Sequence, residues 1–243
     1  MIIGVYDSGL GGVDILNKLI HKYPKHTYIY VADNKYCPYG IRYNDELLKR
    51  VNRVMDFFVH QKVDFVVVAC NTVSNIILGR KNDYQVPIFT ILEANIHLLE
   101  QKRFHQVSII ATSNLIRSEI FNLKLNSDIQ YINGSLLVKY IEENNQEKIK
   151  NEIHTLMKCV SKDSEAVLLA CTHFPLYKDL FISREYKKFI LEGSKDLIYS
   201  LPIKNDSNIQ SIHIFLTKND KEYETKIENI LKDYHILIHN IAL

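Results

Sequence analysis

Two cysteines occupy equivalent places in the sequence, each directly after an apolar run typical of a buried strand. Cys70 follows residues 65–69 (FVVVA), and Cys171 follows residues 166–170 (AVLLA), 101 positions later. Two thiols brought face to face could form a disulfide, bind a metal, or act as acid and base on opposite faces of one carbon atom. The third use would invert a stereocentre, because one group removes a proton and the other delivers one to the far side.

Polar residues directly follow four of the apolar runs, the two before the cysteines and two others. In parallel sheets these polar side chains would all lie at the carboxyl ends of the strands. Asp7 and Ser8 come after residues 2–6, and Thr112 comes after residues 107–111. Because ligands bind beyond the carboxyl ends of the strands in open α/β sheets, we expect these segments to line one site. The candidate residues there are Cys70, Cys171, Asp7, His173, Ser8, Asn71, Thr72, Thr112 and Thr172.

The types of these side chains suit an amino-acid ligand. Asp7 could bind an ammonium group or tune Cys70 from the neighbouring strand, and His173 could exchange a proton with Cys171. The amide and hydroxyl residues that follow the two cysteines, together with backbone N–H groups at helix N-termini, could bind a carboxylate. Donors placed there would stabilise a carbanion whose charge spreads onto the carboxylate oxygens.

The elements that must position these residues alternate between short apolar runs and longer helical patterns, which indicates βαβ units and mostly parallel sheets. The apolar runs predict strands at residues 2–6, 27–32, 63–69, 87–92, 107–111, 166–170, 212–216 and 236–241. Helical spacing predicts helices at residues 13–23, 45–60, 142–160 and 219–232, and Asn44 is predicted to cap the second of these.

The strand-end signatures recur along the chain. Besides the two cysteines, Ser8 and Ser113 end similar runs that lie 105 positions apart. We therefore predict two similar α/β domains with mostly parallel sheets, related by a pseudo-twofold axis, with the active site in the cleft between them. Breaks near residues 93–95 and 204–208 would give a first domain of residues 1–94 plus 206–243 and a second of residues 95–205.

Composition narrows the classes of function. The net charge of +2 is nearly neutral for 243 residues and does not indicate binding to nucleic acid or to an anionic membrane. The sequence has no apolar run of 18 residues, so no transmembrane helix is predicted, and the N-terminus is typical of a strand and not of a signal peptide. The four cysteines form no C-x-x-C pair, so free thiols in a reducing, cytoplasmic compartment are the simplest interpretation.

Four sequence motifs together resemble one family. They are D-S-G-L-G-G at 7–12, C-P-Y-G at 37–40, A-C-N-T at 69–72 and A-C-T-H-F-P-L at 170–176. In this order, and over residues 3–176, the chain resembles the glutamate racemases of the aspartate/glutamate racemase superfamily.

This resemblance implies a cofactor-independent racemisation of glutamate in which Cys70 and Cys171 are the two bases, assisted by Asp7 and His173. It also implies that the substrate contacts Ser8, Tyr39, Gly40, Asn71, Thr72 and Thr172. Among these, Tyr39 and Gly40 would hold the side-chain carboxylate of the substrate. It implies a small-molecule substrate and a reaction that needs neither pyridoxal phosphate nor a metal. The enzyme would be cytoplasmic, would supply D-glutamate for peptidoglycan, and could form a homodimer.

Departures from the family pattern leave an alternative open. Leu115 stands where the family usually has a second threonine, and Lys139 and Tyr140 replace Pro and Leu in the V-K-Y-I-E segment at 138–142. A racemase for aspartate or another acidic amino acid is therefore the second hypothesis.

Two further hypotheses belong to other classes. One is a protein that binds a metal through Cys70, Cys171, His173 and Asp7, although C-x-H is cramped spacing for one ion. The other is a non-catalytic homologue that only binds a ligand. We expect the remaining cysteines, Cys37 in a turn and Cys159 packed in a helix, to lie outside the site.

Overall fold

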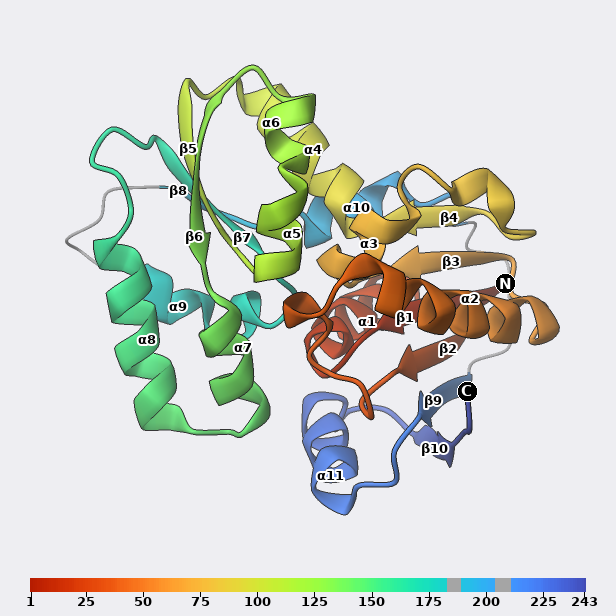
Figure 1. The fold of residues 1–243 in the computed structure, drawn as a ribbon. Helices are drawn as coiled ribbons and strands as arrows, with labels where there is room; N and C mark the ends of the chain where they lie inside the picture. Colours follow the sequence, from red (N-terminus) through yellow and green to blue (C-terminus); the bar gives the residue numbers. More distant parts are fainter. Residues whose placement is uncertain (183–188, 204–210) are drawn as a thin grey trace.

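The computed structural model describes residues 1–182, 189–203 and 211–243, and it contains two sheets (Figure 1). The larger sheet has six parallel strands in the order β10-β9-β2-β1-β3-β4. Its strands are β1 (Ile2–Asp7), β2 (Thr27–Ala32), β3 (Phe65–Val68), β4 (Ile88–Thr90), β9 (Ser211–Leu216) and β10 (Ile236–Asn240). The chain thus returns to the first sheet at its C-terminal end.

The second sheet repeats the arrangement of the first. Its four parallel strands have the order β6-β5-β7-β8, which corresponds strand by strand to β2-β1-β3-β4. They are β5 (Gln106–Ala111), β6 (Asp128–Asn133), β7 (Ala166–Ala170) and β8 (Phe189–Leu191). Two parallel α/β units of matching topology confirm the predicted fold class, and β9 and β10 extend the first unit only.

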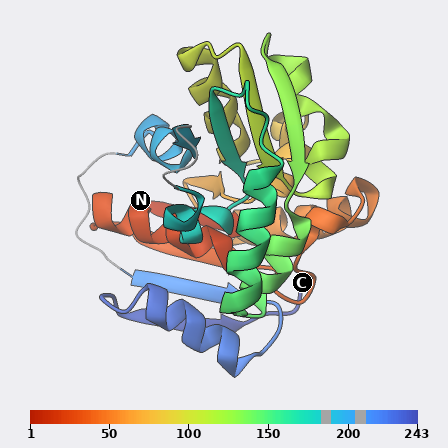
Figure 2. The same ribbon diagram turned by 90° about the vertical axis from the view of Figure 1, so that its left-hand side faces the viewer.

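Helices cover both faces of each sheet, as parallel sheets require. The first sheet has α1 (Gly11–Lys22), α10 (Ser194–Ser200) and α11 (Lys221–Ile230) on one face and α2 (Asn44–His60) and α3 (Asn71–Ile77) on the other. The second has α5 (Ser113–Ser118) and α6 (Ile120–Lys124) on one face and α7 (Ser135–Glu142), α8 (Gln146–Lys158) and α9 (Lys178–Phe181) on the other. Figure 2 shows α7 and α8, in green, side by side.

Some local predictions were wrong. Helix α2 begins at Asn44 itself with Tyr43 in the capping position, and the Asn44 side chain instead accepts a hydrogen bond from Asn114. The helix predicted at 142–160 is present as α8 (Gln146–Lys158), but it begins four residues later than predicted, because Glu142 is the last residue of α7. Cys159 follows α8 and is exposed instead of packed. Among the described residues, no helix combines the length and the apolar character needed to cross a membrane.

Helix α4 (Ile91–Lys102) is shared between the two units. Its Ile91 and Ala94 side chains pack into the core of the first sheet, while Leu92, Ile96 and Leu99 pack into a core of the second. The predicted boundary after residue 94 therefore falls inside a continuous helix. The other predicted boundary, between residues 205 and 206, lies outside the described residues. The exact domain limits stay a prediction.

Candidate active site

The two cysteines lie at equivalent strand ends of the two α/β units, which form the two walls of the site. Cys70 follows β3 and Cys171 follows β7, the corresponding strand of the second sheet, and both side chains are buried. The register of β1 and β3 places Ser8 opposite Cys70, and their Oγ and Sγ atoms are 3.7 Å apart. Burial, reinforced by the negative charge of Asp7, raises the pKa of Cys70 to about 12. With this pKa, Cys70 is a neutral thiol at neutral pH.

Asp7 lies at the end of β1 and is fully buried. Its Oδ1 accepts a hydrogen bond from the Gly9 amide at 2.8 Å, and its Oδ2 accepts one from the Thr172 hydroxyl at 3.1 Å. Burial raises the pKa of Asp7 to about 6, against the lowering effects of His173 and of these two donors. Because Thr172 comes from the second unit, this carboxylate links the two walls.

His173 lies between Cys171 and a carboxylate that the sequence analysis did not single out. Its Nδ1 is 3.7 Å from the Cys171 Sγ, and its Nε2 is 2.6 Å from Glu142 Oε1. Burial lowers the pKa of His173, but the contacts with Cys171 and Glu142 outweigh burial and hold that pKa well above its usual value. His173 is accordingly an imidazolium that can donate a proton toward the thiol.

Glu142, the last residue of α7, receives several hydrogen bonds at once. Besides His173, its Oε1 accepts from the Leu10 amide at 3.3 Å and from the Cys37 thiol at 3.4 Å. Although burial raises the pKa of Glu142, these donors, led by His173, lower it below its ordinary value. Glu142 appeared in the sequence only as the end of the V-K-Y-I-E segment, and its contact with His173 joins residues 31 positions apart.

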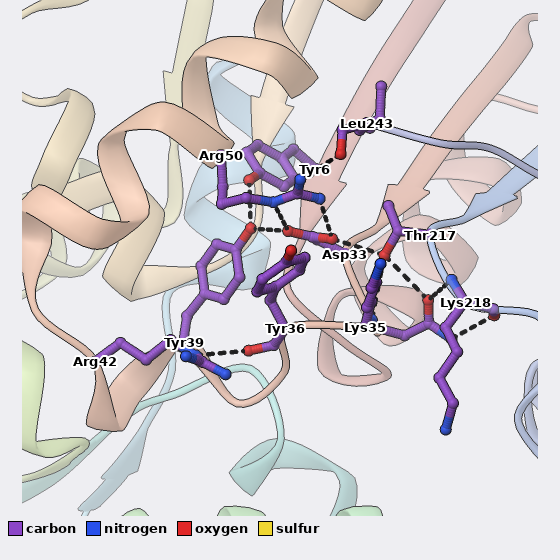
Figure 3. A network of polar contacts seen from close by, with 11 residues as sticks. Tyr6, Asp33, Lys35, Tyr36, Tyr39, Arg42, Arg50, Thr217, Lys218 and Leu243 are labelled. Carbon is purple, nitrogen blue, oxygen red and sulfur yellow. Dashed lines mark hydrogen bonds and ion pairs between the residues drawn. The ribbon is translucent and has the colours of Figure 1, made fainter.

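Tyr39 and Gly40 form a short turn that a buried ion pair holds in place (Figure 3). Asp33, which follows β2, accepts hydrogen bonds from Arg50 at 2.8 and 3.0 Å and from the Tyr39 hydroxyl. Asp33 also accepts one from the Thr217 hydroxyl at 2.6 Å. The Tyr39 ring is fully buried, so its backbone has little freedom to move relative to the first sheet.

At Gly40 the turn is in close contact with Thr112 of the second unit. A Cβ atom at this position would lie only 2.4 Å from the Cβ of Thr112, so only glycine allows this approach. Nearby, the hydroxyl oxygens of Thr72 and Thr112 are 3.5 Å apart. Asn71 accepts a hydrogen bond from Asn95 of α4 at 3.0 Å. The nine predicted residues at strand ends therefore gather at one place, and Tyr39 and Gly40 border it.

The residues that raised doubt about the substrate lie elsewhere. Leu115 is fully buried in a core of the second sheet, with its side chain among apolar neighbours. Lys139 is largely exposed and lies 3.8 Å from Glu143, and Tyr140 packs at the edge of the other core of that sheet. Of the described residues with metal-binding side chains, one donor atom each from Cys37, Glu142 and His173 gather within 4.8 Å, and Cys70 and Cys171 are not in that group.

The arrangement can move protons at a carbon bound between the two walls. Each wall carries one thiol, and the thiols have different partners, Ser8 for Cys70 and His173 for Cys171. Buried polar groups around them are available to an ammonium and to carboxylates. Since these groups are at most 8% exposed, a ligand can reach them only after the structure around them has moved.

Comparisons with known proteins agree with this geometry. The family model described as Asp/Glu/Hydantoin racemase matches residues 5–187. Glutamate racemase 1 of Caldanaerobacter subterraneus subsp. tengcongensis is 30% identical, over 99% of this chain and 96% of its own length. The glutamate racemase structure from Aquifex pyrophilus is 28% identical and superposes with a TM-score of 0.82, covering 98% of each chain.

The fold is also shared with the glutamate racemase isoform RacE1 of Bacillus anthracis. That structure is 22% identical and gives a TM-score of 0.90, covering 100% of this chain and 97% of its own. The match of the family model to most of the chain, and the full-length relative at 30% identity, lead to one conclusion. This chain belongs to the Asp/Glu/Hydantoin racemase family.

Proposed function

We propose that this protein interconverts L- and D-glutamate without a cofactor, using Cys70 and Cys171 as the two proton-transfer groups. The observation that carries the proposal is the placement of the two buried thiols at equivalent strand ends of the two units, each with its own polar partner. A racemase needs an acid and a base on opposite faces of one carbon, and this arrangement supplies one from each wall.

The proposed reaction conserves protons at every step. One cysteine, as a thiolate, removes the α-hydrogen and becomes a thiol, which leaves a planar carbanion. The other cysteine, as a thiol, donates its proton to the opposite face and becomes a thiolate. In the reverse direction the two cysteines exchange roles, so each must be able to hold and release a proton.

The neighbours of the thiols supply the tuning that this requires. The substrate ammonium, bound near Asp7, would add a positive charge beside Cys70 and so lower the raised pKa of that thiol. On the other wall, His173 can return a proton to Cys171, and Glu142 holds the ring of His173 in position. We assign Glu142 as a positioning residue, because its contact with Cys171 runs through His173.

The remaining polar residues fit the two carboxylates of glutamate. Asn71, Thr72 and Thr172 would bind the α-carboxylate, where their donors stabilise the developing negative charge. Tyr39 and Gly40 would hold the side-chain carboxylate, as the family resemblance implies. The buried Asp33–Arg50 pair fixes the Tyr39 hydroxyl, and so sets the distance from this turn to the thiols.

Glutamate is favoured over aspartate for two reasons. The relatives compared above carry the name glutamate racemase. In addition, Leu115 and Lys139, which had suggested a different substrate, lie in a core and on the surface instead of among the candidate contacts. We further propose that the enzyme works in the cytoplasm, where its thiols stay reduced, and that it supplies D-glutamate for peptidoglycan.

Proton NMR in D2O tests the proposal directly. The purified protein is incubated with L- or D-glutamate, and separately with L- or D-aspartate, without added cofactor. We expect the α-proton signal of both glutamate enantiomers to disappear, while circular dichroism of the solution decays to zero. Exchange with aspartate but not glutamate would select the alternative substrate. No exchange with either acid would overturn the racemase assignment.

A further inference from the structure

A second cluster of reactive side chains lies behind His173, on the side away from Cys171. Cys37 comes from the loop after β2, Glu142 ends α7, and His173 follows β7. One donor atom from each lies within 4.8 Å of the other two. Glu142 Oε1 is the common point, 2.6 Å from His173 Nε2 and 3.4 Å from Cys37 Sγ.

The three donors are the set that Zn²⁺ prefers. Zinc binds thiolate sulfur at about 2.3 Å and imidazole nitrogen or carboxylate oxygen at about 2.0–2.2 Å, usually in a tetrahedron. Donors around one such ion are spaced about 3–4 Å apart by this geometry. The spacings here, from 2.6 Å to at most 4.8 Å, bracket that range, so small side-chain rotations would admit the ion.

An ion can reach the cluster without entering the cleft between the catalytic thiols. Cys37 and Glu142 line a cavity of about 440 Å³ whose rim includes the exposed Lys139. Its acidic residues Glu143, Asp220 and Glu222, with Glu142, balance the positive charge of its lysines. The cavity therefore does not repel a divalent cation.

A buried hydroxyl without a partner points to the same place. Within the described part of the chain, the Tyr223 hydroxyl has no hydrogen-bond partner, although this residue is only 8% exposed. A Cβ atom built on Gly9 would lie 2.5 Å from Glu142 Oε1, 2.7 Å from Cys37 Sγ and 3.3 Å from the Tyr223 hydroxyl. Three side chains thus converge beside Gly9, and Tyr223 is placed to bind a water on the fourth coordination position of an ion.

We propose that Cys37, Glu142 and His173 form an inhibitory binding site for Zn²⁺ and chemically similar ions. An ion bound to His173 Nε2 would replace the proton there, and the direct contact between His173 and Glu142 would give way to coordination of both residues to the ion. The Nδ1 proton that faces Cys171 would remain, but its transfer would leave a metal-bound imidazolate instead of a neutral imidazole. His173 would therefore become a much weaker proton donor to Cys171. The binding itself stands apart from the proposed racemase activity, whereas the inhibition rests on it.

Cobalt substitution tests the binding. The full-length, reduced protein is titrated anaerobically with Co²⁺, and the charge-transfer absorption from thiolate to cobalt is recorded. We expect a saturable band in the wild type, in Cys70→Ser and in Cys171→Ser, and no band in Cys37→Ser. Cys159→Ser, which changes an exposed thiol after α8, is the matched control and should keep the band. A band that survives in Cys37→Ser, or that disappears in Cys171→Ser, would overturn the site.

Zinc inhibition tests the consequence. Cys37→Ser keeps a hydroxyl that can donate to Glu142, so its rate without metal should stay close to that of the wild type. The Zn²⁺ concentration for half-inhibition should rise on the order of tenfold or more, because a ligand is lost. Equal zinc sensitivity of the two proteins would refute the inhibitory role. An inactive wild type that still shows the Cys37-dependent cobalt band would refute the proposed function and leave the metal site standing.

Discussion

The hydroxyl of Thr172 donates a hydrogen bond to the carboxylate of Asp7, 3.1 Å away, and this bond joins the two walls of the candidate site. Asp7 ends the first strand of one sheet, and Thr172 follows a strand of the other. The same contact closes the site and places a hydroxyl beside a carboxylate that we expect to bind the substrate ammonium. Closure and substrate binding are therefore coupled through one pair of residues.

Replacing Thr172 tests this coupling. Thr172→Val leaves the buried carboxylate of Asp7 without one of its two donors, which costs about 1.5–3 kcal/mol for a hydrogen bond to a charged group. We expect kcat/KM for glutamate to fall by about 10–100-fold. Thr172→Ser keeps the hydroxyl and should retain most of the activity. Equal losses in both variants would show that the hydroxyl itself is unimportant.

The two thiols are predicted to be separately essential. Cys70→Ala and Cys171→Ala should each lower the rate of racemisation by about 10²–10⁴-fold, because one proton-transfer group is missing. Each variant should still eliminate HCl from one enantiomer of 3-chloroglutamate, since that reaction needs one base only, and the two variants should prefer opposite enantiomers. Racemisation at the wild-type rate by either variant would contradict the two-base mechanism.

The raised pKa of Asp7 predicts a pH-dependent stability. Its value of about 6 in the folded protein exceeds the ordinary 3.8, so burial favours the protonated form. The stability that protonation provides is complete below pH 3.8 and is lost as the pH rises through 6. Asp7→Asn cannot titrate and so does not lose this stability. The free energy of unfolding of the variant minus that of the wild type should therefore increase by at most about 3 kcal/mol from acidic to neutral pH.

Urea unfolding at a series of pH values between 4 and 7.5 measures this difference for Asp7→Asn. The asparagine can still accept from the Gly9 amide and donate to Thr172, so the fold should tolerate it. The variant should nevertheless lose racemase activity, because it cannot offer a charge to the ammonium. A pH slope identical to that of the wild type would mean that Asp7 titrates normally in the folded protein.

The lack of a side chain at Gly40 is predicted to allow the two units to approach each other at the site. In Gly40→Ala the added methyl would overlap Thr112, and overpacking of this kind costs about 1–3 kcal/mol. We expect kcat/KM to fall by about 10–100-fold, with only a small change in melting temperature. Gly79→Ala is the matched control, because a Cβ there meets no atom within 4 Å. The prediction is wrong if both alanine variants behave alike.

Leu115 is predicted to affect stability and not specificity. Leu115→Ala should destabilise the protein by about 2–5 kcal/mol, the usual cost of truncating a buried leucine. The ratio of kcat/KM for glutamate to that for aspartate should not change. Lys139→Ala, at the surface, should alter neither quantity. A changed substrate ratio in the Leu115 variant would return the substrate question to this position.

Local patterns predicted the strands that carry the two cysteines, because these strands are uniformly apolar and covered on both faces. Strand β7 has the predicted bounds, and β3 lies within its predicted run. Strand β6 was missed, because its sequence DIQYIN mixes polar and apolar residues and only one of its six residues is buried. The polar strand-end residues could be predicted because parallel strands bring such positions to one edge.

Contacts between distant segments were beyond local patterns. Glu142 lies at a helix end, where a glutamate usually faces solvent, and only the tertiary structure places it against His173. The Asp33–Arg50 pair likewise joins a loop to the second helix. Cys37 was expected in a turn outside the site, and local patterns gave no sign that its thiol donates to Glu142, the residue that contacts His173.

Helix α4 has a consequence for how the protein unfolds. Alternate side chains of this one helix complete a hydrophobic core in each unit, Ala94 in the first and Ile96 in the second. Pulling the units apart would expose one set of these side chains to water, so neither half has a self-sufficient interior. The two units should consequently melt in a single cooperative transition, although their repeated topology suggests an origin from a duplicated ancestor.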